Sequence, residues 1–198
     1  MKMTRYGGLL AFAAAWAAMT CRPGTALAGQ EPVVSVEQTG PRTCRIEGRF
    51  SVEASSRTAW QVLTDYEGLP RFVSSMRVSR IAQRRPGGVL LEQEAVAKAY
   101  LLSRSVSVLL DVREDPERGL AFEDVSHRDF EFYRGRWRIE GGGAALSVRY
   151  ELEARRKFAA PGFVARGAFR KNAEALLRQV RAEIARRAAE RSSHGTSN

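Results

Sequence analysis

Histidine, the side chain most often used in acid–base catalysis, is scarce in this chain. The chain contains two histidines: His194 lies in the polar C-terminal tail, and His127 lies in a polar connection, SHRD at residues 126–129. We interpret His127 as a loop residue, with acid–base catalysis as the alternative, because histidine changes charge near neutral pH. No Gly-x-Ser-x-Gly elbow, phosphate-binding loop, dinucleotide fingerprint or cluster of metal-ligating residues occurs. We therefore expect no metal or other cofactor and assign no catalytic residue.

Arg104 is the polar residue that strand parity singles out. A guanidinium cannot lose its proton, so among apolar neighbours it must find an anion, a carbonyl or water. Two interpretations stay open: Arg104 reaches the rim of the sheet and pairs with Glu94, or it anchors a carboxylate, phosphate or quinone oxygen of a ligand. The apolar residues that share its face of the predicted strand are Leu102, Val106, Val108, Leu110 and Val112.

Four aromatic residues in the predicted strands have a similar double interpretation. Aromatic side chains at strand parity usually belong to a core, yet ligand pockets also favour apolar bodies that carry a few polar tips. We treat them as candidate cavity residues. They are Tyr100, Tyr133, Trp137 and Tyr150.

The first 28 residues resemble an export signal. A positive start is followed by an apolar stretch at residues 9–19 and by the small-x-small triplet ALA at residues 26–28. The apolar stretch is too short to span a bilayer as a helix. We expect cleavage after Ala28 and a periplasmic location. Lipidation at Cys21 is the alternative, although the preceding residues 18–20 (AMT) fit a lipoprotein signal poorly.

The chain is strongly basic, which bears on its partners. It carries 32 Lys+Arg against 22 Asp+Glu, a net charge of +10. Residues 155–191 alone contain eleven basic and three acidic residues. For an exported protein this charge favours an anionic membrane surface or acidic envelope polymers as partners rather than nucleic acid. A solvated helix face is the alternative explanation.

Cysteine usage indicates a domain that folds without disulfides. After the predicted cleavage only Cys44 remains, on the apolar face of the first predicted strand, where we interpret it as a buried structural thiol. A chain of this length buries about 70% of its unfolded surface in one domain, which is enough for stability without disulfides. We expect a monomer.

Apolar periodicity predicts one α+β domain over residues 43–191, between an extended leader at 29–42 and a disordered tail at 192–198. Residues 44–53 alternate as a strand, a helix follows Ser55 or Ser56, and residues 69–73 form one more helical turn. Six further strands are separated by turn signals such as the glycines at 141–143. Their predicted ranges are 76–84, 89–97, 100–113, 120–125, 130–140 and 144–156.

A long helix is predicted from about Pro161, where proline is tolerated in a first turn. Its apolar residues recur at i, i+4, i+7, i+8, i+11 and i+15, which indicates one face packed on the sheet. A curled antiparallel sheet covered by one helix leaves a cavity along that face. The stripe, expected to be core face and cavity wall at once, comprises Phe169, Ala173, Leu176, Leu177, Val180 and Ile184.

Two groups of segments resemble the START-like superfamily. FSVEAS at residues 50–55 and AWQVLTDYE at 59–67 are similar to the start of such domains. GRWRI at 135–139 and LSVRYEL at 146–152 resemble the last two strands of its polyketide cyclase/dehydrase and coenzyme Q-binding branch. The resemblance implies a helix-grip fold, in which a seven-stranded curved antiparallel sheet wraps around a long C-terminal helix.

The resemblance implies little about chemistry, because the superfamily contains lipid carriers, other ligand binders, cyclases and hydrolases. We expect an exported protein that binds or shuttles a hydrophobic small molecule, such as a lipid, an isoprenoid quinone or a polyketide-like compound. The alternative is a cyclase or dehydratase that acts in the same cavity, since aromatic cyclases of this fold use Arg and Tyr there.

Overall fold

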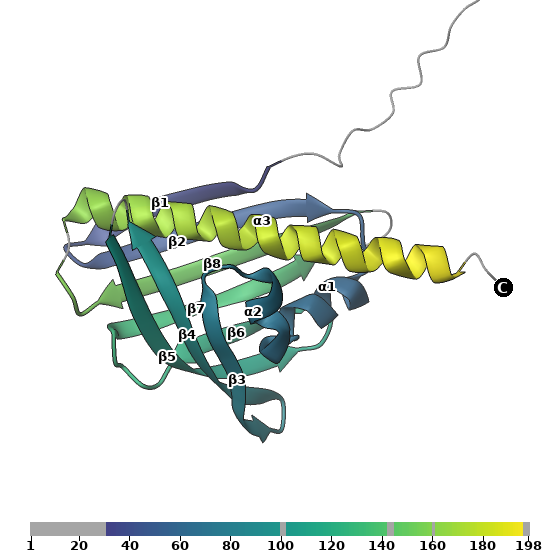
Figure 1. The fold of residues 1–198 in the computed structure, drawn as a ribbon, viewed down its shortest axis with the longest axis horizontal. Coiled ribbons are helices and arrows are strands. Elements are labelled where there is room, and N and C mark those ends of the chain that lie inside the picture. The colour runs from purple at the N-terminus through teal and green to yellow at the C-terminus, as the bar shows by residue number, and fades with distance from the viewer. Residues whose placement is uncertain (1–30, 100–101, 142–144, 160, 196–198) are drawn as a thin grey trace, which may run out of the picture.

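The computed structural model describes residues 31–99, 102–141, 145–159 and 161–195. The predicted signal peptide, including Cys21, lies outside these described residues. They form an eight-stranded sheet, short helical segments after the second strand and a long C-terminal helix (Figure 1). The elements are β1 (Val33–Gly40), β2 (Thr43–Val52), α1 (Ser56–Leu63), a 3-10 turn (Tyr66–Gly68), α2 (Leu69–Phe72), β3 (Met76–Arg85), β4 (Gly88–Ala99), β5 (Leu102–Asp115), β6 (Gly119–Asp124), β7 (Phe130–Glu140), β8 (Leu146–Arg156) and α3 (Gly162–Gly195).

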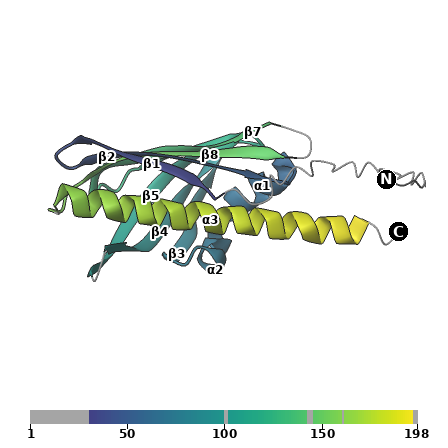
Figure 2. The same ribbon diagram turned by 90° about the horizontal axis from the view of Figure 1, so that it is seen from above.

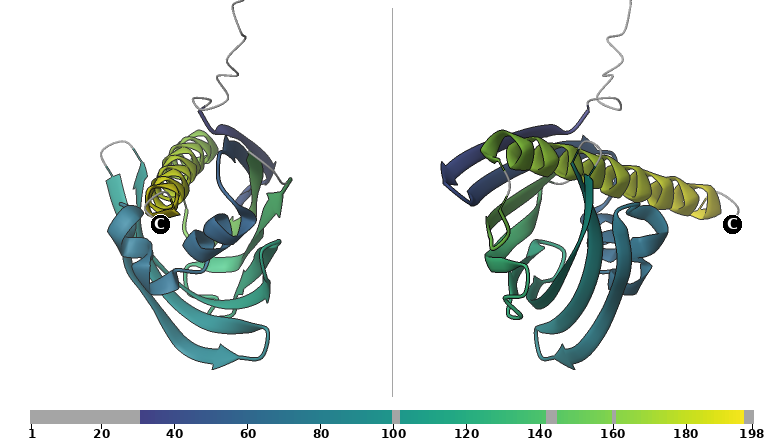
Figure 3. Two further views of the ribbon diagram at one scale, coloured as in Figure 1. Left: turned by 90° about the vertical axis from the view of Figure 1, so that its right-hand side faces the viewer. Right: turned by 60° about the vertical axis from the view of Figure 1, so that its left-hand side comes forward.

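The sheet order is β1-β2-β8-β7-β6-β5-β4-β3, and all neighbouring strands are antiparallel. Strands β3 to β8 follow one another as a meander, whereas β2 pairs with the last strand, β8. The α1–α2 segment carries the chain from one side of the sheet to the other. The sheet curls so that α3 lies in its trough (Figure 3), as expected for the START-like fold.

The expectation of seven strands was wrong, because residues 33–40 form an additional edge strand. β1 pairs with β2 from Val33↔Arg49 to Gly40↔Thr43, in a segment that we expected to be an extended leader. Its side chains are mostly exposed, and only Val34 is buried. An edge strand with one buried side chain lacks the alternation that marks a half-buried strand, and its pairing depends on β2.

Helix α3 covers the concave face of the sheet and runs alongside β1 and β2 (Figure 2). The predicted apolar stripe faces the sheet: Ala173, Leu177 and Val180 are buried. Residues 192–195, expected in the disordered tail, continue the helix to a length of 34 residues. No helix in the described part of the chain combines the length and apolarity that crossing a bilayer requires.

The C-terminal half of α3 is attached to α1 and to the turn that follows it. Ser55 caps α1 by accepting a hydrogen bond from the Thr58 amide at 3.1 Å. Arg187 of α3 forms ion pairs with Asp65 at 2.6 Å and with Glu183 at 2.7 Å. Hydrogen bonds from Arg186 and Arg187 lower the pKa of Glu183 to about 2. These contacts fix the far end of the helix relative to the sheet.

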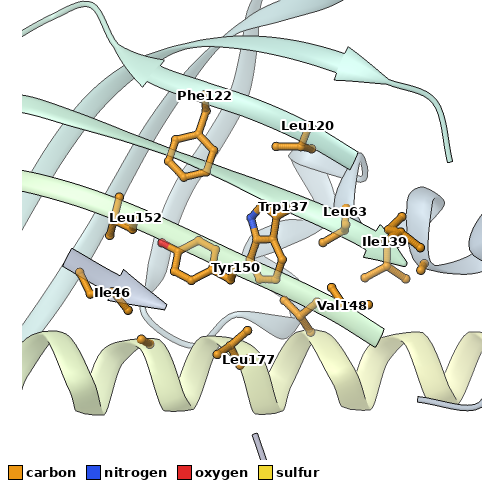
Figure 4. Packing of buried hydrophobic residues seen from close by; sticks show 14 of the residues in the cluster. Ile46, Leu63, Leu120, Phe122, Trp137, Ile139, Val148, Tyr150, Leu152 and Leu177 are labelled. Carbon is orange, nitrogen blue, oxygen red and sulfur yellow. The ribbon is translucent and has the colours of Figure 1, made fainter. Parts of the chain in front are cut away.

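The core lies between the concave face and α3 (Figure 4). Trp137 of β7 and Tyr150 of β8 pack together, with ring centroids 4.6 Å apart. Leu177 points from α3 toward β8, and Ile139 and Val148 close the end nearest α1. The core is filled near α1, and unfilled space remains next to the N-terminal half of α3.

Candidate ligand cavity

A cavity of about 350 Å³ lies between the concave face and the N-terminal half of α3. The sheet contributes side chains from β2, β3, β4, β5, β7 and β8, and α3 contributes about three turns of mostly small or apolar residues. The α3 residues are Val164, Ala165, Ala168, Phe169, Asn172, Ala173 and Leu176. The small alanines leave room where larger side chains would fill the trough.

A second space of about 110 Å³ lies deeper, toward α1. Its lining is almost wholly apolar and includes Trp137 and Val180. The two spaces share the side chains of Met76, Tyr133, Tyr150 and Leu176 in their walls. These four residues therefore form the partition between a larger outer compartment and a smaller inner one.

Two tyrosines on this partition carry the polar groups nearest the middle of the cavity. Burial raises the pKa of Tyr133, and burial raises the pKa of Tyr150 well above its usual value. The neighbouring Tyr133 hydroxyl raises the pKa of Tyr150 further, by charge and by hydrogen bonding. Both phenols therefore stay protonated at neutral pH, so they can donate hydrogen bonds but are poor general bases.

Arg104 lies at the rim of the larger compartment. Its side chain is 53% exposed and donates to Asp129 Oδ1 at 3.0 Å. Its guanidinium carbon lies 4.4 Å from the ring centre of Phe158. The rim position agrees with the first of our two interpretations, but the acidic partner is Asp129 and the expected Glu94 pair was wrong. Strand pairing alone could not identify Asp129, which follows β6 in the chain.

Arg156 is a cavity residue that our reasoning from sequence missed. It is the last residue of β8, is 1% exposed and lines the larger compartment. The parity argument that selected Arg104 could have found it, because Arg156 continues the alternation of Tyr150, Leu152 and Ala154 on the concave face. Its position in the basic region 155–191 instead suggested a solvated residue.

The other predicted site residues lie in the two compartments, in the core or outside the described residues. Phe169 and Leu176 line the larger compartment, and Trp137 and Val180 line the smaller one. Leu177 is fully buried and packs in the core. Tyr100 lies outside the described residues.

His127 is exposed and lies away from both compartments. Its backbone adopts φ 49°, and its Nδ1 lies 3.0 Å from the Glu131 carbonyl oxygen. These are features of a tight connection between strands, which agrees with our interpretation of His127 as a loop residue.

A buried carboxylate, Asp124, was also missed, and its contacts show a structural role. Its Oδ1 accepts hydrogen bonds from the Leu109 amide at 3.0 Å and from the Ser126 amide at 2.9 Å and hydroxyl at 2.7 Å. Asp124 thereby fixes the connection between β6 and β7. Asp124 is the last residue of β6 and is soon followed by the polar residues 126–129, so nothing in the sequence indicates that it is buried.

The described lining of both compartments contains no Asp, Glu, His or Cys. In the described ranges no three such residues are grouped as metal ligands either. A larger hollow of about 590 Å³ lies on the opposite face of the sheet, but ion pairs such as Arg134–Glu153 and Arg136–Glu151 border it. The apolar space under α3 is therefore the candidate site for a hydrophobic molecule.

Comparison with known proteins gives a consistent picture. Residues 52–181 match the sequence model of the family described as polyketide cyclase / dehydrase and lipid transport. No curated protein matches the chain significantly.

Solved structures with the same fold come from several organisms. The Zhui aromatase/cyclase from Streptomyces sp. R1128 is 17% identical, with a TM-score of 0.62 over 73% of this chain and 95% of that one. A STAR-related lipid transfer protein from Xanthomonas axonopodis is 13% identical, with a TM-score of 0.62 over 79% and 94%. Human STARD10 is 14% identical, with a TM-score of 0.64 over 84% and 74%. At these identities the similarity shows the fold.

Proposed function

Because this chain belongs to the polyketide cyclase/dehydrase and lipid-transport family, we propose that it binds and shuttles a hydrophobic small molecule held under α3. The observation that carries this function is the apolar cavity of about 350 Å³, extended by the inner space of about 110 Å³. Its size is within the range of small-molecule sites, and burying each methylene of a ligand there contributes about 0.8 kcal/mol. A lipid, an isoprenoid quinone and a polyketide-like compound all have the required apolar body.

In this proposal the mature protein is exported to the periplasm after cleavage behind Ala28. The N-terminal pattern at residues 1–28 supports this location. The mass of the protein recovered from its own periplasm tests it: a mature chain beginning at Gly29 is expected. A lipid-modified chain beginning at Cys21, or an uncleaved chain, would contradict it.

Ligand binding is tested by filling the cavity. Ala168 lines the larger compartment, whereas Ala182 lies on the same helix with an exposed side chain. We expect Ala168→Phe to weaken binding of the neutral fluorescent probe N-phenyl-1-naphthylamine about tenfold or more. The larger side chain would occupy part of the cavity and reduce the apolar surface that the probe can bury there. Ala182→Phe should leave binding unchanged. Equal binding by both variants would contradict a site under α3.

Native mass spectrometry and solvent extraction of the periplasmic protein would identify the molecule it carries. A co-purifying hydrophobic compound is expected. Protein that is free of ligand and does not bind the probe would contradict the proposed function.

A cyclase or dehydratase is the second candidate, and the Tyr133–Tyr150 pair favours it. Two protonated phenols on the cavity partition could donate hydrogen bonds to a substrate carbonyl and orient a polyketide-like chain. The described lining offers no carboxylate or imidazole that could remove a proton. This composition supports binding as the first candidate.

An anionic membrane surface is the proposed site of ligand exchange. Phe163, in the first turn of α3, is 66% exposed, and the next residue, Val164, lines the cavity. Arg166 and Lys171 are exposed on the same part of the helix. An aromatic side chain flanked by cations, beside the cavity, is suited to insertion at a negatively charged lipid interface.

A further inference from the structure

Among the described residues that line the larger compartment, one charged side chain is buried, at the end formed by β8. Arg156 is 1% exposed, and its parity on β8 directs it to the concave face. Its amide donates to the Arg42 carbonyl oxygen at 3.2 Å, which holds the strand end against the β1–β2 connection. The backbone at Arg156 is therefore held in place by strand pairing, which fixes where its guanidinium lies.

Arg156 also borders a second hollow, of about 310 Å³, formed with Pro41, Arg42, Ala159 and Pro161. The same side chain therefore stands between the apolar compartment and a region that is open to solvent and contains another arginine. A ligand with its body in the compartment would place one end at this boundary.

The charged side chains in the described lining of the larger compartment are all positive. This described lining contains Arg104 and Arg156 but no Asp or Glu. Arg104 is 53% exposed at the rim and pairs with Asp129 at 3.0 Å, whereas Arg156 is buried. The Arg156 charge acts on buried groups nearby: burial raises the pKa of the Cys44 thiol, and the positive charge of Arg156 partly offsets this increase.

A buried guanidinium favours an anion in its surroundings, because it keeps its charge and water is largely excluded there. Its planar set of donors also matches the oxygens of a carboxylate or phosphate. The other described lining residues are apolar, apart from the Tyr133 and Tyr150 hydroxyls and a few neutral polar groups. The compartment therefore combines one cationic end with a hydrophobic body.

We propose that the ligand is an anionic amphiphile whose carboxylate or phosphate binds at Arg156 while its apolar body lies under α3, an inference that rests on the proposed binding function. The Tyr133–Tyr150 partition then receives the far end of the apolar body. Arg104 is half-exposed at the rim, where solvent screens its charge, so it contributes less to affinity than the buried Arg156.

Competition for the neutral probe N-phenyl-1-naphthylamine tests the headgroup. Dodecanoate, dodecyl phosphate and dodecanol, each below its micellar concentration, have the same chain length and differ in charge. With wild-type protein we expect the two anions to displace the probe at about tenfold lower concentration than dodecanol, since hydrogen bonds to charged groups contribute about 1.5–3 kcal/mol. Comparing carboxylate with phosphate shows which headgroup fits better.

Arg156→Gln should bring the three competitors to within about threefold of one another, because the charged contact is removed. Arg156→Lys should retain a preference for the anions. The matched control is Arg155→Gln, whose parent side chain lies on the opposite face, 50% exposed and paired with Glu131 at 2.8 Å. The control should behave as wild type.

Equal displacement by anions and dodecanol with wild-type protein would overturn the inference, and this comparison does not depend on whether an Arg156 variant folds. A folded Arg156→Gln that keeps the full preference would overturn it as well. Failure of the probe itself to bind wild-type protein would instead contradict the proposed function. The two failures are therefore distinguishable.

Discussion

Leu177 of α3 packs directly against Gly48 of β2. A Cβ atom added to Gly48 would lie 2.4 Å from Leu177 Cδ1 and 3.6 Å from Val34 Cγ2. The missing side chain lets the helix approach this side of the sheet closely. The remaining space under the helix is bordered by residues of β4 and β5, including Ala95 and Val106. One glycine thus helps to decide where the cavity lies.

Gly48→Ala is expected to destabilise the protein by about 1–3 kcal/mol, the usual cost of adding atoms to a filled core. Leu177 is fully buried, so its side chain has little room to move away. Chemical denaturation followed by circular dichroism measures the change. An unchanged free energy of unfolding would mean that the helix can shift outward without loss.

Gly167→Ala should have the opposite effect. Gly167 lies within α3, is exposed, and a Cβ there would meet nothing within 4 Å. Replacing an exposed helical glycine by alanine stabilises by about 0.5–1 kcal/mol, because the unfolded chain loses conformational freedom. The same denaturation measurement tests it. Destabilisation would indicate that this end of α3 is not helical in solution.

Glu183 should contribute a pH-dependent part of the stability. Its pKa, about 2 in the folded protein, lies below the ordinary 4.5 because of hydrogen bonds from Arg186 and Arg187. A lowered folded-state pKa gives stability that is complete above about pH 4.5 and is lost as the pH falls toward 2. Glu183→Gln should therefore cost about 1 kcal/mol at pH 7 and much less near pH 2.5. Urea titrations at both pH values measure the difference, and an equal cost at both would contradict this account.

Carrier and enzyme differ in what polar cavity substitutions remove. For a carrier, Tyr133→Phe and Arg104→Ala should change probe affinity by less than about threefold, and wild-type protein should leave an added polyketide-like compound unaltered. Mass spectrometry after incubation detects any conversion. If wild-type protein converts the compound and the variants bind it without converting it, the enzyme interpretation is correct.

Membrane docking should depend on the position of the charges and not only on their number. Replacing Phe163 by Ala, and Arg166 and Lys171 by Gln, should weaken co-sedimentation with anionic vesicles about tenfold, since each cation near such a surface contributes about 1 kcal/mol. The charge-matched control replaces Arg57 and Arg80, which lie on α1 and β3, by Gln. It should bind as wild type does.

Salt should weaken this binding sharply, because screening extends over about 10 Å at 0.1 M ionic strength. Equal binding to anionic and neutral vesicles, or equal loss in both variants, would leave the basic residues with a role in solubility alone.

The sequence by itself determined the elements whose patterns are local. Alternation at period two and turn signals between strands predicted seven of the strands, and a stripe at period 3.6 predicted the packed face of α3, because each pattern requires only residues that are close in sequence. Segments such as residues 59–67 also carried the family resemblance, which the comparisons confirmed. From these features the curled sheet under one helix followed.

Only the tertiary structure decided which residues from distant elements meet. Residues 33–40 form strand β1 because they pair with β2 at the edge of the sheet. Arg104 pairs with Asp129 because the chain after β6 returns to the rim near β5. Arg156 was buried because β8 ends beneath α3 and not in solvent. These outcomes depend on contacts between segments far apart in the chain, and no local period of hydrophobicity encodes them.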